Sequence, residues 1–513
     1  MNTRSSEDIL RPESTGLRKT TQAYNKSKLG FLAFAGSLGG ICLGYNTCII
    51  ASALIFIEKD FPTITNTVRQ LFVSLTIACA AIGAIFGGIL ADRIGRKTTI
   101  IVSDLFLILG PGILWSTGTL KYLLLGRVLI GFGLGISALV STIFLSETAP
   151  SRIRGAVVGM YQVMIALGVF FAFGASLLAF KWKLMVGLGL FPAALQFLLV
   201  GFFLQETPYF LQHQKEDILA EHHMREYYNT GSDRGSQEFY FDVGALRQFQ
   251  NEEGNIIKSY SEIFSKYRRN LNIGCMLHIL QQLSGINIIL YYGPQILRDA
   301  GFGNNQDSRV FFGFLFLGLI YLLSSIFALF KIDTVGRREL MLRCLPFIVI
   351  SMLLVTTSMF LRHYFDYWKL SGLTSFFGAV VFLMFYSNGF QIQPWLIASE
   401  IFPVHIKGQA NGLISFVNWS FNFLLTSLFF AMTLSDLGKV ITYSVLAVIN
   451  LFSIWFAYNY VGETKGLIIS ECIKLYQHYS GSETFKHSKE AITRMLDNAS
   501  QNQQHPHFIH NQV

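Results

Sequence analysis

Neutral hydrogen-bonding side chains gather in one apolar stretch of the sequence, where Gln281, Gln282, Ser284 and Asn287 lie within seven residues. On a helix, Gln281, Ser284 and Asn287 share one face, with Gln282 beside them. Amides and hydroxyls donate and accept hydrogen bonds without charge, which suits a neutral polyhydroxyl ligand. A carboxylate or phosphate ligand would call for Arg or Lys, and residues 275–292 contain neither. Each amide alone is better explained by a bond to another helix, whereas four polar groups this close favour a cavity.

Further amides and indoles occur in other apolar runs. Unsatisfied polar groups in hydrocarbon are costly, so these side chains need partners inside the protein. An indole face can stack on the C–H surface of a sugar ring, although a buried Trp more often serves packing. The residues concerned are Gln162, Gln391, Gln393, Trp395, Trp419 and Asn422.

Charged motifs repeat in the two halves of the chain. A D-x-x-G-R-[RK] motif occupies 92–97 and 333–338, an E-x-x-P-x-x-x-[RK]-G motif occupies 147–155 and 400–408, and a Glu-Thr pair follows at 206–207 and 463–464. The three pairs keep one order at offsets of about 240–257 residues. A chain duplicated in this way folds as two similar bundles around a shared cavity.

The charges of these motifs fall in loops too short to be solvated independently. We expect them to pair across neighbouring loops and to latch the two bundles together in one conformation; the simpler alternative is that they only anchor helix ends at the headgroups. They are Asp92, Arg93, Arg96, Glu147, Arg154, Glu206, Asp333, Arg337, Arg338, Glu400, Lys407 and Glu463.

Membrane helices must carry these groups. The 513 residues are 52% hydrophobic and only 14% charged, with a mean hydropathy of +0.44, whereas soluble domains carry about 25% charged residues. A bilayer core of about 30 Å needs roughly 20 apolar residues per helix. Twelve runs qualify, so we expect an all-α membrane protein: 30–57, 70–91, 98–117, 120–146, 155–180, 184–204, 271–298, 310–331, 340–361, 371–398, 410–433 and 438–460.

The twelve predicted helices divide six and six. We expect a cytoplasmic N-terminal tail at 1–28 without a cleavable signal peptide, a six-helix bundle at 29–204, a central cytoplasmic loop at 205–270, a second six-helix bundle at 271–461, and a cytoplasmic C-terminal tail at 462–513. An even number of spans puts both termini on one side, and the Lys and Arg of the tails and the central loop make that side cytoplasmic.

Other function classes are disfavoured. The net charge of +9 sits in loops and tails rather than on a nucleic-acid-binding face, and none of the six cysteines forms a CxxC pair. We therefore expect no nucleic acid, no metal, no cofactor and no disulfide framework. A membrane enzyme is disfavoured because no His/Glu metal pattern, nucleophile elbow or phosphate-binding Gly loop is present.

These motifs resemble those of the sugar porter branch of the major facilitator superfamily, especially the facilitative glucose transporters. The resemblance covers about 30–470. Its motifs are 88–97, Gly126-Arg127, 147–155, Glu206-Thr-Pro208, Gln281 through Tyr292, Pro394-Trp395 through Pro403, Asn418-Trp419 and Glu463-Thr-Lys-Gly466.

The resemblance implies the major facilitator fold, alternating access by rocking of the two bundles, and intracellular helices within 205–270. It implies a small-molecule sugar as substrate, in the lipid bilayer of the plasma membrane, carried by a protein that works as a monomer. It also implies sugar contacts at Gln162, Gln281, Gln282, Asn287, Trp395, Trp419 and Asn422.

The sequence departs from the family pattern at several places. The usual G-P-x-P-W reads Gln-Ile-Gln-Pro-Trp at 391–395, so its first Gly and Pro are absent. Tyr321 stands where the family has Asn, Ser387 where it has an acid, and Tyr209 where Arg is common. A hexose or a related polyol is therefore a safer expectation than glucose itself.

One position bears on coupling to protons. Proton-coupled relatives commonly place Asp where this chain has Asn46, and an amide cannot take up and release a proton as a carboxylate can. Asn46 thus favours facilitated diffusion. The competing candidate is Asp104, an acid inside the third run, for which pairing with another helix is equally open. Some polyol-transporting relatives look similar around this acid, which keeps inositol in play.

The leading hypothesis is a facilitative hexose transporter. A proton-coupled symporter of a sugar or a polyol such as myo-inositol, using Asp104, is the second. A transporter-like sugar sensor is the third; sensors of this kind need long cytoplasmic extensions, whereas this C-terminal tail has only about 50 residues.

Overall fold

The computed structural model describes residues 23–61, 66–177, 181–247, 256–290, 308–365, 367–432, 435–467 and 469–478. Tyr291 and Tyr292, and most of both expected tails, lie outside these ranges. The described residues are almost entirely helical, with one isolated β-bridge between Tyr24 and Tyr228. Twelve helical segments among them are long and apolar enough to cross a membrane, which confirms the expected fold class.

Seven helices and one 3-10 turn make up the first bundle, in which α6 and α7 together form the sixth span. Pro150 follows the end of α4 and separates it from α5, because proline cannot continue the helical hydrogen-bond ladder. The elements are α1 (Lys26–Asp60), α2 (Asn66–Ile94), α3 (Arg96–Ser116), α4 (Leu120–Thr148), η1 (Ser151–Ile153), α5 (Arg154–Leu177), α6 (Trp182–Gly187) and α7 (Leu190–Phe203).

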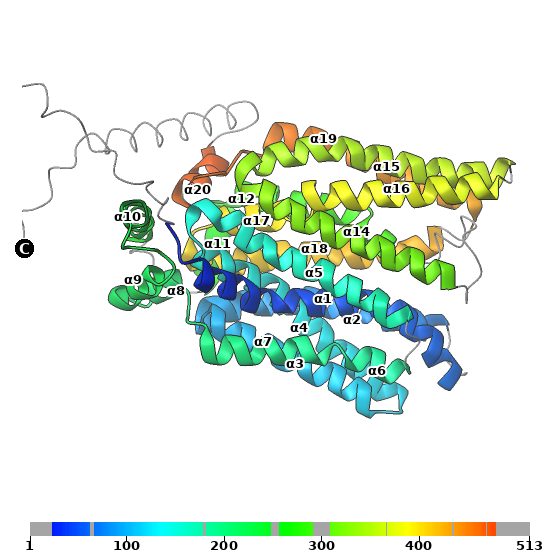
Figure 1. Ribbon diagram of the computed structural model, residues 1–513, viewed down its shortest axis with the longest axis horizontal. Coiled ribbons are helices and arrows are strands. Elements are labelled where there is room, and N and C mark those ends of the chain that lie inside the picture. The colour runs from blue at the N-terminus through cyan, green and yellow to red at the C-terminus, as the bar shows by residue number, and fades with distance from the viewer. Residues whose placement is uncertain are drawn as a thin grey trace, which may run out of the picture.

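The second bundle repeats this plan, and the two bundles lie side by side along the long axis of the molecule (Figure 1). Its tenth span is divided into α16 and α17. The elements are α12 (Arg268–Leu283), α14 (Ser308–Val335), α15 (Arg337–Phe365), α16 (Trp368–Gly389), α17 (Gln393–Glu400), α18 (Val404–Met432) and α19 (Asp436–Tyr460).

Two helix pairs join the bundles: α2 packs along α18, and α5 packs along α14. The first pair is close because both helices carry glycine at the crossing. A Cβ on Gly88 would lie 2.3 Å from the carbonyl oxygen of Gly408, so no larger residue fits there.

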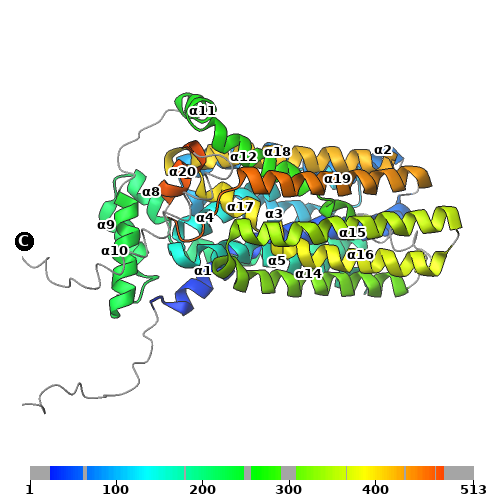
Figure 2. The same cartoon turned by 90° about the horizontal axis from the view of Figure 1, so that it is seen from above.

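Shorter helices cover one end of the bundles, which we call the polar end (Figure 2). The residues before α1 join them there, since the amide of Asn25 donates to the carbonyl of Tyr227 at 3.0 Å. These helices are α8 (Pro208–His213), α9 (Asp217–Arg225), α10 (Asp233–Arg247), α11 (Ile256–Ser265) and α20 (Ile469–His478).

Candidate functional site

A cavity of ≈ 80 Å³ lies between the two bundles. That space is enough for roughly five to eight water molecules. All seven residues that the resemblance implied as sugar contacts line this one cavity, and none of the described residues that line it carries a charge. The seven are Gln162, Gln281, Gln282, Asn287, Trp395, Trp419 and Asn422.

Breaks in two helices shape the cavity wall, and the first follows α12. Helix α12 ends at Leu283, and Gly285 has φ +102°, a conformation that favours glycine. Gln281, Ser284 and Asn287 therefore do not share one face of a continuous helix, which corrects the expectation from the sequence. The Ser284 hydroxyl instead donates to the carbonyl of Gln281 at 2.7 Å, within its own chain turn.

The second break, between α16 and α17, is stabilised by a residue of the first. Gln281 Nε2 donates to the carbonyls of Phe390 and Gln391 at 2.9 and 3.0 Å. Those carbonyls lie in the gap between two helices, where a buried carbonyl needs a partner from elsewhere. Gln281 therefore stabilises the break opposite it as well as lining the cavity.

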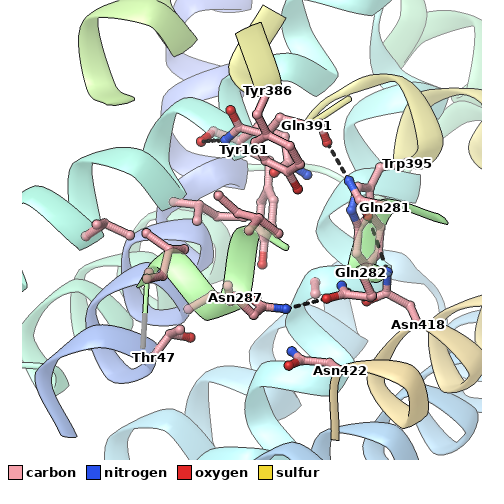
Figure 3. A pocket seen from close by; sticks show the side chains of 18 of the residues that line it. Thr47, Tyr161, Gln281, Gln282, Asn287, Tyr386, Gln391, Trp395, Asn418 and Asn422 are labelled. Carbon is pink, nitrogen blue, oxygen red and sulfur yellow. Dashed lines mark hydrogen bonds between the residues drawn. The ribbon is translucent and has the colours of Figure 1, made fainter. Parts of the chain in front are cut away.

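A chain of amides continues along α12 and α18 (Figure 3). Gln282 Nε2 donates to Asn418 Oδ1 at 2.9 Å, and Asn287 donates to Gln282 Oε1. Asn418 Nδ2 lies 3.0 Å from His278 Nδ1 and 3.3 Å from Gln281 Oε1. The network fixes the orientation of the amide groups before any ligand arrives.

Gln391 connects the bundles within the cavity wall. Its Nε2 donates to the carbonyl of Gln162 on α5 at 3.0 Å, and its Oε1 accepts from the Ser325 hydroxyl on α14 at 2.9 Å. One side chain therefore bonds to both bundles at the position where the family pattern has glycine.

Two of the buried amide and indole N–H groups that line the cavity have no partner among the described residues. These are Nε2 of Gln162 and Nε1 of Trp419, both buried. Trp395 is held edge-on against the His278 ring, with centroids 4.7 Å apart. Buried polar groups without partners are uncommon, so these two are poised for a ligand or for water.

The cavity includes residues that sequence reasoning missed, and each has a signal that only packing reveals. Tyr161, Tyr321 and Tyr386 line it, as do Thr47 and Asn418. Tyrosines in apolar runs are equally at home at membrane interfaces, so their types alone did not identify them. Gln393 was singled out but does not line the cavity; its amide donates to the carbonyl of Asn388 at 2.7 Å.

At the polar end, reciprocal caps join the two bundles. Asp92 on α2 accepts from the amides of Gly408 and Gln409 on α18, at 3.1 and 2.9 Å. Asp333 on α14 accepts from the amides of Gly155 and Ala156 on α5, at 3.1 and 2.7 Å. Each aspartate thus sits at the start of a helix in the other bundle, where a negative charge is stabilised.

Behind these caps lie two buried groups of ion pairs. We call the caps and these ion pairs together the latch. In one, Glu147 lies 3.0 Å from Arg96 Nε and 3.6 Å from Lys407 Nζ of the second bundle. In the other, Glu400 lies 3.4 Å from Arg337 Nη2 and 3.8 Å from Arg154 Nη1 of the first bundle. The charges expected to pair across loops do meet here.

Two further glutamates hold the tight turns of the repeated motif. Glu206 accepts from the amides of Arg96 and Lys97, and Glu463 does the same for Arg337 and Arg338. Burial raises the pKa of Glu206, although these backbone donors oppose the shift.

Glycine is required at these turns. Gly95 has φ +91° and Gly336 φ +115°, and a Cβ at either would collide with Glu206 or Glu463. Among the remaining motif residues, the Arg338 guanidinium donates to the carbonyl of Tyr458 at 2.8 Å, and Arg93 is exposed.

The coupling candidates occupy different places. Asn46 donates to the carbonyl of Cys42 at 2.9 Å and lines a small pocket with Arg127, Thr76 and Trp419. Asp104 is fully buried within the first bundle and does not line the central cavity. Where the structure describes the chain, no group of three or more His, Cys, Asp or Glu side chains could hold a metal ion.

Comparison with known proteins identifies the family. The model of the family described as "Sugar (and other) transporter" matches residues 32–476. The chain belongs to this family. It is accordingly a transporter and not an enzyme, and a multi-pass membrane protein whose substrate is a small molecule of the sugar class.

Relatives of this sugar transporter agree over nearly the whole chain. It is 31% identical to a probable metabolite transport protein of Bacillus subtilis, over 94% of this chain and 99% of that protein. It is 27% identical to the protein named "Probable inositol transporter 2" of Arabidopsis thaliana, over 90% and 93%.

The fold matches solved structures of the major facilitator superfamily. One is a proton:xylose symporter bound to 6-bromo-6-deoxy-D-glucose, with a TM-score of 0.75 and 22% identity, covering 88% of this chain and 100% of that one. At this identity the likeness concerns the fold.

Proposed function

We propose that this transporter is a uniporter that carries a neutral hexose down its concentration gradient by alternating access. The observation that carries the proposal is the uncharged, amide-lined cavity between the two bundles. Polar bonds between the bundles close the molecule at one end. Substrate in such a cavity shifts the balance between conformations according to its affinity for each.

The chemistry of the wall fits a polyhydroxyl ligand. Each hydroxyl of a sugar both donates and accepts, as do the amides of Gln282, Asn287 and Asn422. The unpartnered donors of Gln162 and Trp419 would gain acceptors from sugar oxygens. Trp395 and Trp419 offer apolar ring faces to the C–H side of the sugar. The seven cavity residues are therefore the proposed substrate contacts.

The latch explains how the cavity is closed. With its caps and ion pairs formed, the polar end is shut, and these bonds must separate when that end opens. At the opposite end, α5 and α14 meet through apolar contacts such as Phe173 against Phe314, with centroids 5.0 Å apart. We assign the polar end to the cytoplasm, because the tails and central loop carry the Lys and Arg excess. We place the protein in the plasma membrane as a monomer.

Asn46 supports uniport. The amide lies in the Arg127 pocket, where it cannot exchange a proton. A symporter remains the second candidate for one reason: a relative from Escherichia coli, 29% identical over 86% of this chain, is named as a galactose-proton symporter.

Proteoliposomes test the proposal. Counterflow of radiolabelled D-glucose is measured with and without an imposed pH gradient, in competition with fructose, galactose, xylose and myo-inositol. Uniport predicts counterflow of a hexose that is the same with and without the pH gradient. Accumulation driven by the pH gradient would establish the symporter, and competition by myo-inositol alone would replace the hexose by a cyclic polyol. Gln281→Leu tests the site, since it removes the amide that bonds to the break between α16 and α17. Asn459→Leu, on the outer face of α19, is its matched control.

A further inference from the structure

A buried acid in the first bundle has no counter-charge. Asp104 on α3 has no exposed surface, and neither carboxyl oxygen has a hydrogen-bond or ion-pair partner among the described residues. An ionised carboxylate in such a place costs several kcal/mol, whereas a protonated carboxyl is neutral.

Titratable groups on two other helices lie near this acid, the Cys42 thiol on α1 and the Tyr161 hydroxyl on α5. Helix α4 packs against α3 at this level, because a Cβ on Gly133 would lie 3.0 Å from the carbonyl oxygen of Ser103. One turn further along α4 stands Ser137, which does not titrate.

The cluster is compact. The Tyr161 hydroxyl lies near Ser137, and neither hydroxyl has a hydrogen-bond partner among the described residues. The Ser137 hydroxyl and Gln196 Oε1 lie 2.1 and 2.8 Å from the point where a Cβ on Gly39 would stand. Gln196 Oε1 is also buried without a partner. The absence of a side chain at Gly39 leaves the room in which these groups meet.

Tyr161 belongs to two places at once. Its side chain lines the central cavity, as those of Tyr386 and Gln391 do (Figure 3), and its hydroxyl lies near Ser137. A change in charge at Asp104 therefore acts on a side chain that forms the cavity wall.

We propose that Asp104 is a proton-binding site whose occupancy controls sugar binding in the central cavity through Tyr161. The site would be protonated in the latched conformation seen here. The effect on sugar binding rests on the proposed function, but the proton site itself does not. If the latched conformation holds a proton that other conformations release, linkage requires sugar affinity to fall as the pH rises. The fall approaches about tenfold per pH unit where the carboxyl is ionised in the sugar-free protein.

The site is first tested without sugar. Infrared spectroscopy of the purified full-length protein is expected to show the C=O stretch of a protonated carboxyl at mildly acid pH, and to lose it over the pH range in which sugar affinity falls. The band should be absent in Asp104→Asn, which is nearly isosteric with the neutral acid, and present in Asp436→Asn, which removes an exposed acid. A wild-type protein without a band that Asp104→Asn abolishes overturns the proposal.

The coupling is then tested in vesicles with equal pH on both sides, using D-glucose and myo-inositol as probes. Affinity should fall with pH in the wild type and stay constant in Asp104→Asn. Tyr161→Phe should keep the infrared band and lose the pH dependence of sugar affinity. This variant tests the link even if Asp104→Asn does not fold. An unchanged pH profile in Asp104→Asn overturns the link. Uphill accumulation abolished by Asp104→Asn would refute uniport and support the site, whereas a band without transport of any sugar would refute only the proposed function.

Discussion

Gln391 shows how one substitution changes what a helix break can do. Where the family pattern has glycine, this chain places an amide that bonds to α5 of the first bundle and to Ser325 of the second. The break remains, since Gln281 satisfies its freed carbonyls. A residue of the cavity wall has thereby become a tie between the bundles.

Replacing Gln391 by Gly should loosen the latched conformation. The lost bond is worth about 0.5–1.5 kcal/mol, so the unlatched fraction should rise roughly two- to tenfold. The native thiol of Cys472 reports this, because it is fully buried on α20 near Glu400 and Arg154 of the latch. The measurement is its maleimide labelling rate at fixed pH, read by mass spectrometry.

Gln393→Gly is the matched control for that variant. Gln393 lies two residues away and is equally buried, but its amide bonds to Asn388 of the same bundle. In Gln393→Gly, the labelling rate of Cys472 should stay close to the wild-type rate. Equal acceleration by both variants would show that added backbone freedom, rather than the tie between bundles, is responsible.

At the scale of elements, the sequence was a good guide to the spans, whereas what holds their interruptions in place depends on contacts between distant helices. The run predicted at 120–146 is observed as Leu120–Thr148, because apolar length is a local property. The run predicted as one helix at 371–398 is instead α16 and α17. That break is stabilised by Gln281, 109 residues earlier in the chain, which no local pattern reveals.

The candidate site divides in the same way. Residue type and spacing found Gln281, Gln282 and Asn287, because amides are rare in apolar helices. The cavity-facing role of Tyr161 depends instead on how α5 is rotated against α1, which composition does not encode.

Docking of α11 on α18 should depend on pH. Burial raises the pKa of Glu262, but its bonds to His405 (3.0 Å) and Lys266 outweigh this and leave it below the usual 4.5. A lowered pKa means that this contact contributes stability above pH 4.5 and loses it as the pH falls through the folded-state value. Hydrogen exchange of the α11 amides should therefore accelerate in that acid range.

Glu262→Gln should show the faster exchange already at neutral pH and little further change on acidification. Lys266→Met is the control, since its exposed pair with Glu262 is local and worth a few tenths of a kcal/mol, and the bond between Glu262 and His405 stays in place. Acid-accelerated exchange that persists in Glu262→Gln would assign the effect to another group.

At the scale of the whole molecule, the latch determines which end can open. Glu147→Gln leaves Arg96 and Lys407 buried with less compensation, and removing one partner of a buried pair costs roughly 3–5 kcal/mol. Since Lys407 lies in the other bundle, the cost is relieved when the polar end opens. Cys472 should then become labelled at least tenfold faster.

Glu400→Gln should also speed the labelling of Cys472, because the Glu400 carboxylate pairs with Arg337 of its own bundle and with Arg154 of the other. Glu339→Gln is the matched control: it removes an acid of the same end that is exposed and pairs with Arg343 one turn along its own helix. If all three variants labelled alike, the ion pairs between bundles would not determine the conformation.

The reciprocal caps carry a consequence for the origin of the fold. Each half presents one aspartate and one helix start, and each aspartate serves the other half's helix start. Asp92 has the same relation to Gly408 as Asp333 has to Gly155, so the interface obeys approximate two-fold symmetry. A six-helix ancestor bearing a single copy of both features would have closed as a homodimer with the same bonds. Gene fusion then had only to join two subunits that already fitted.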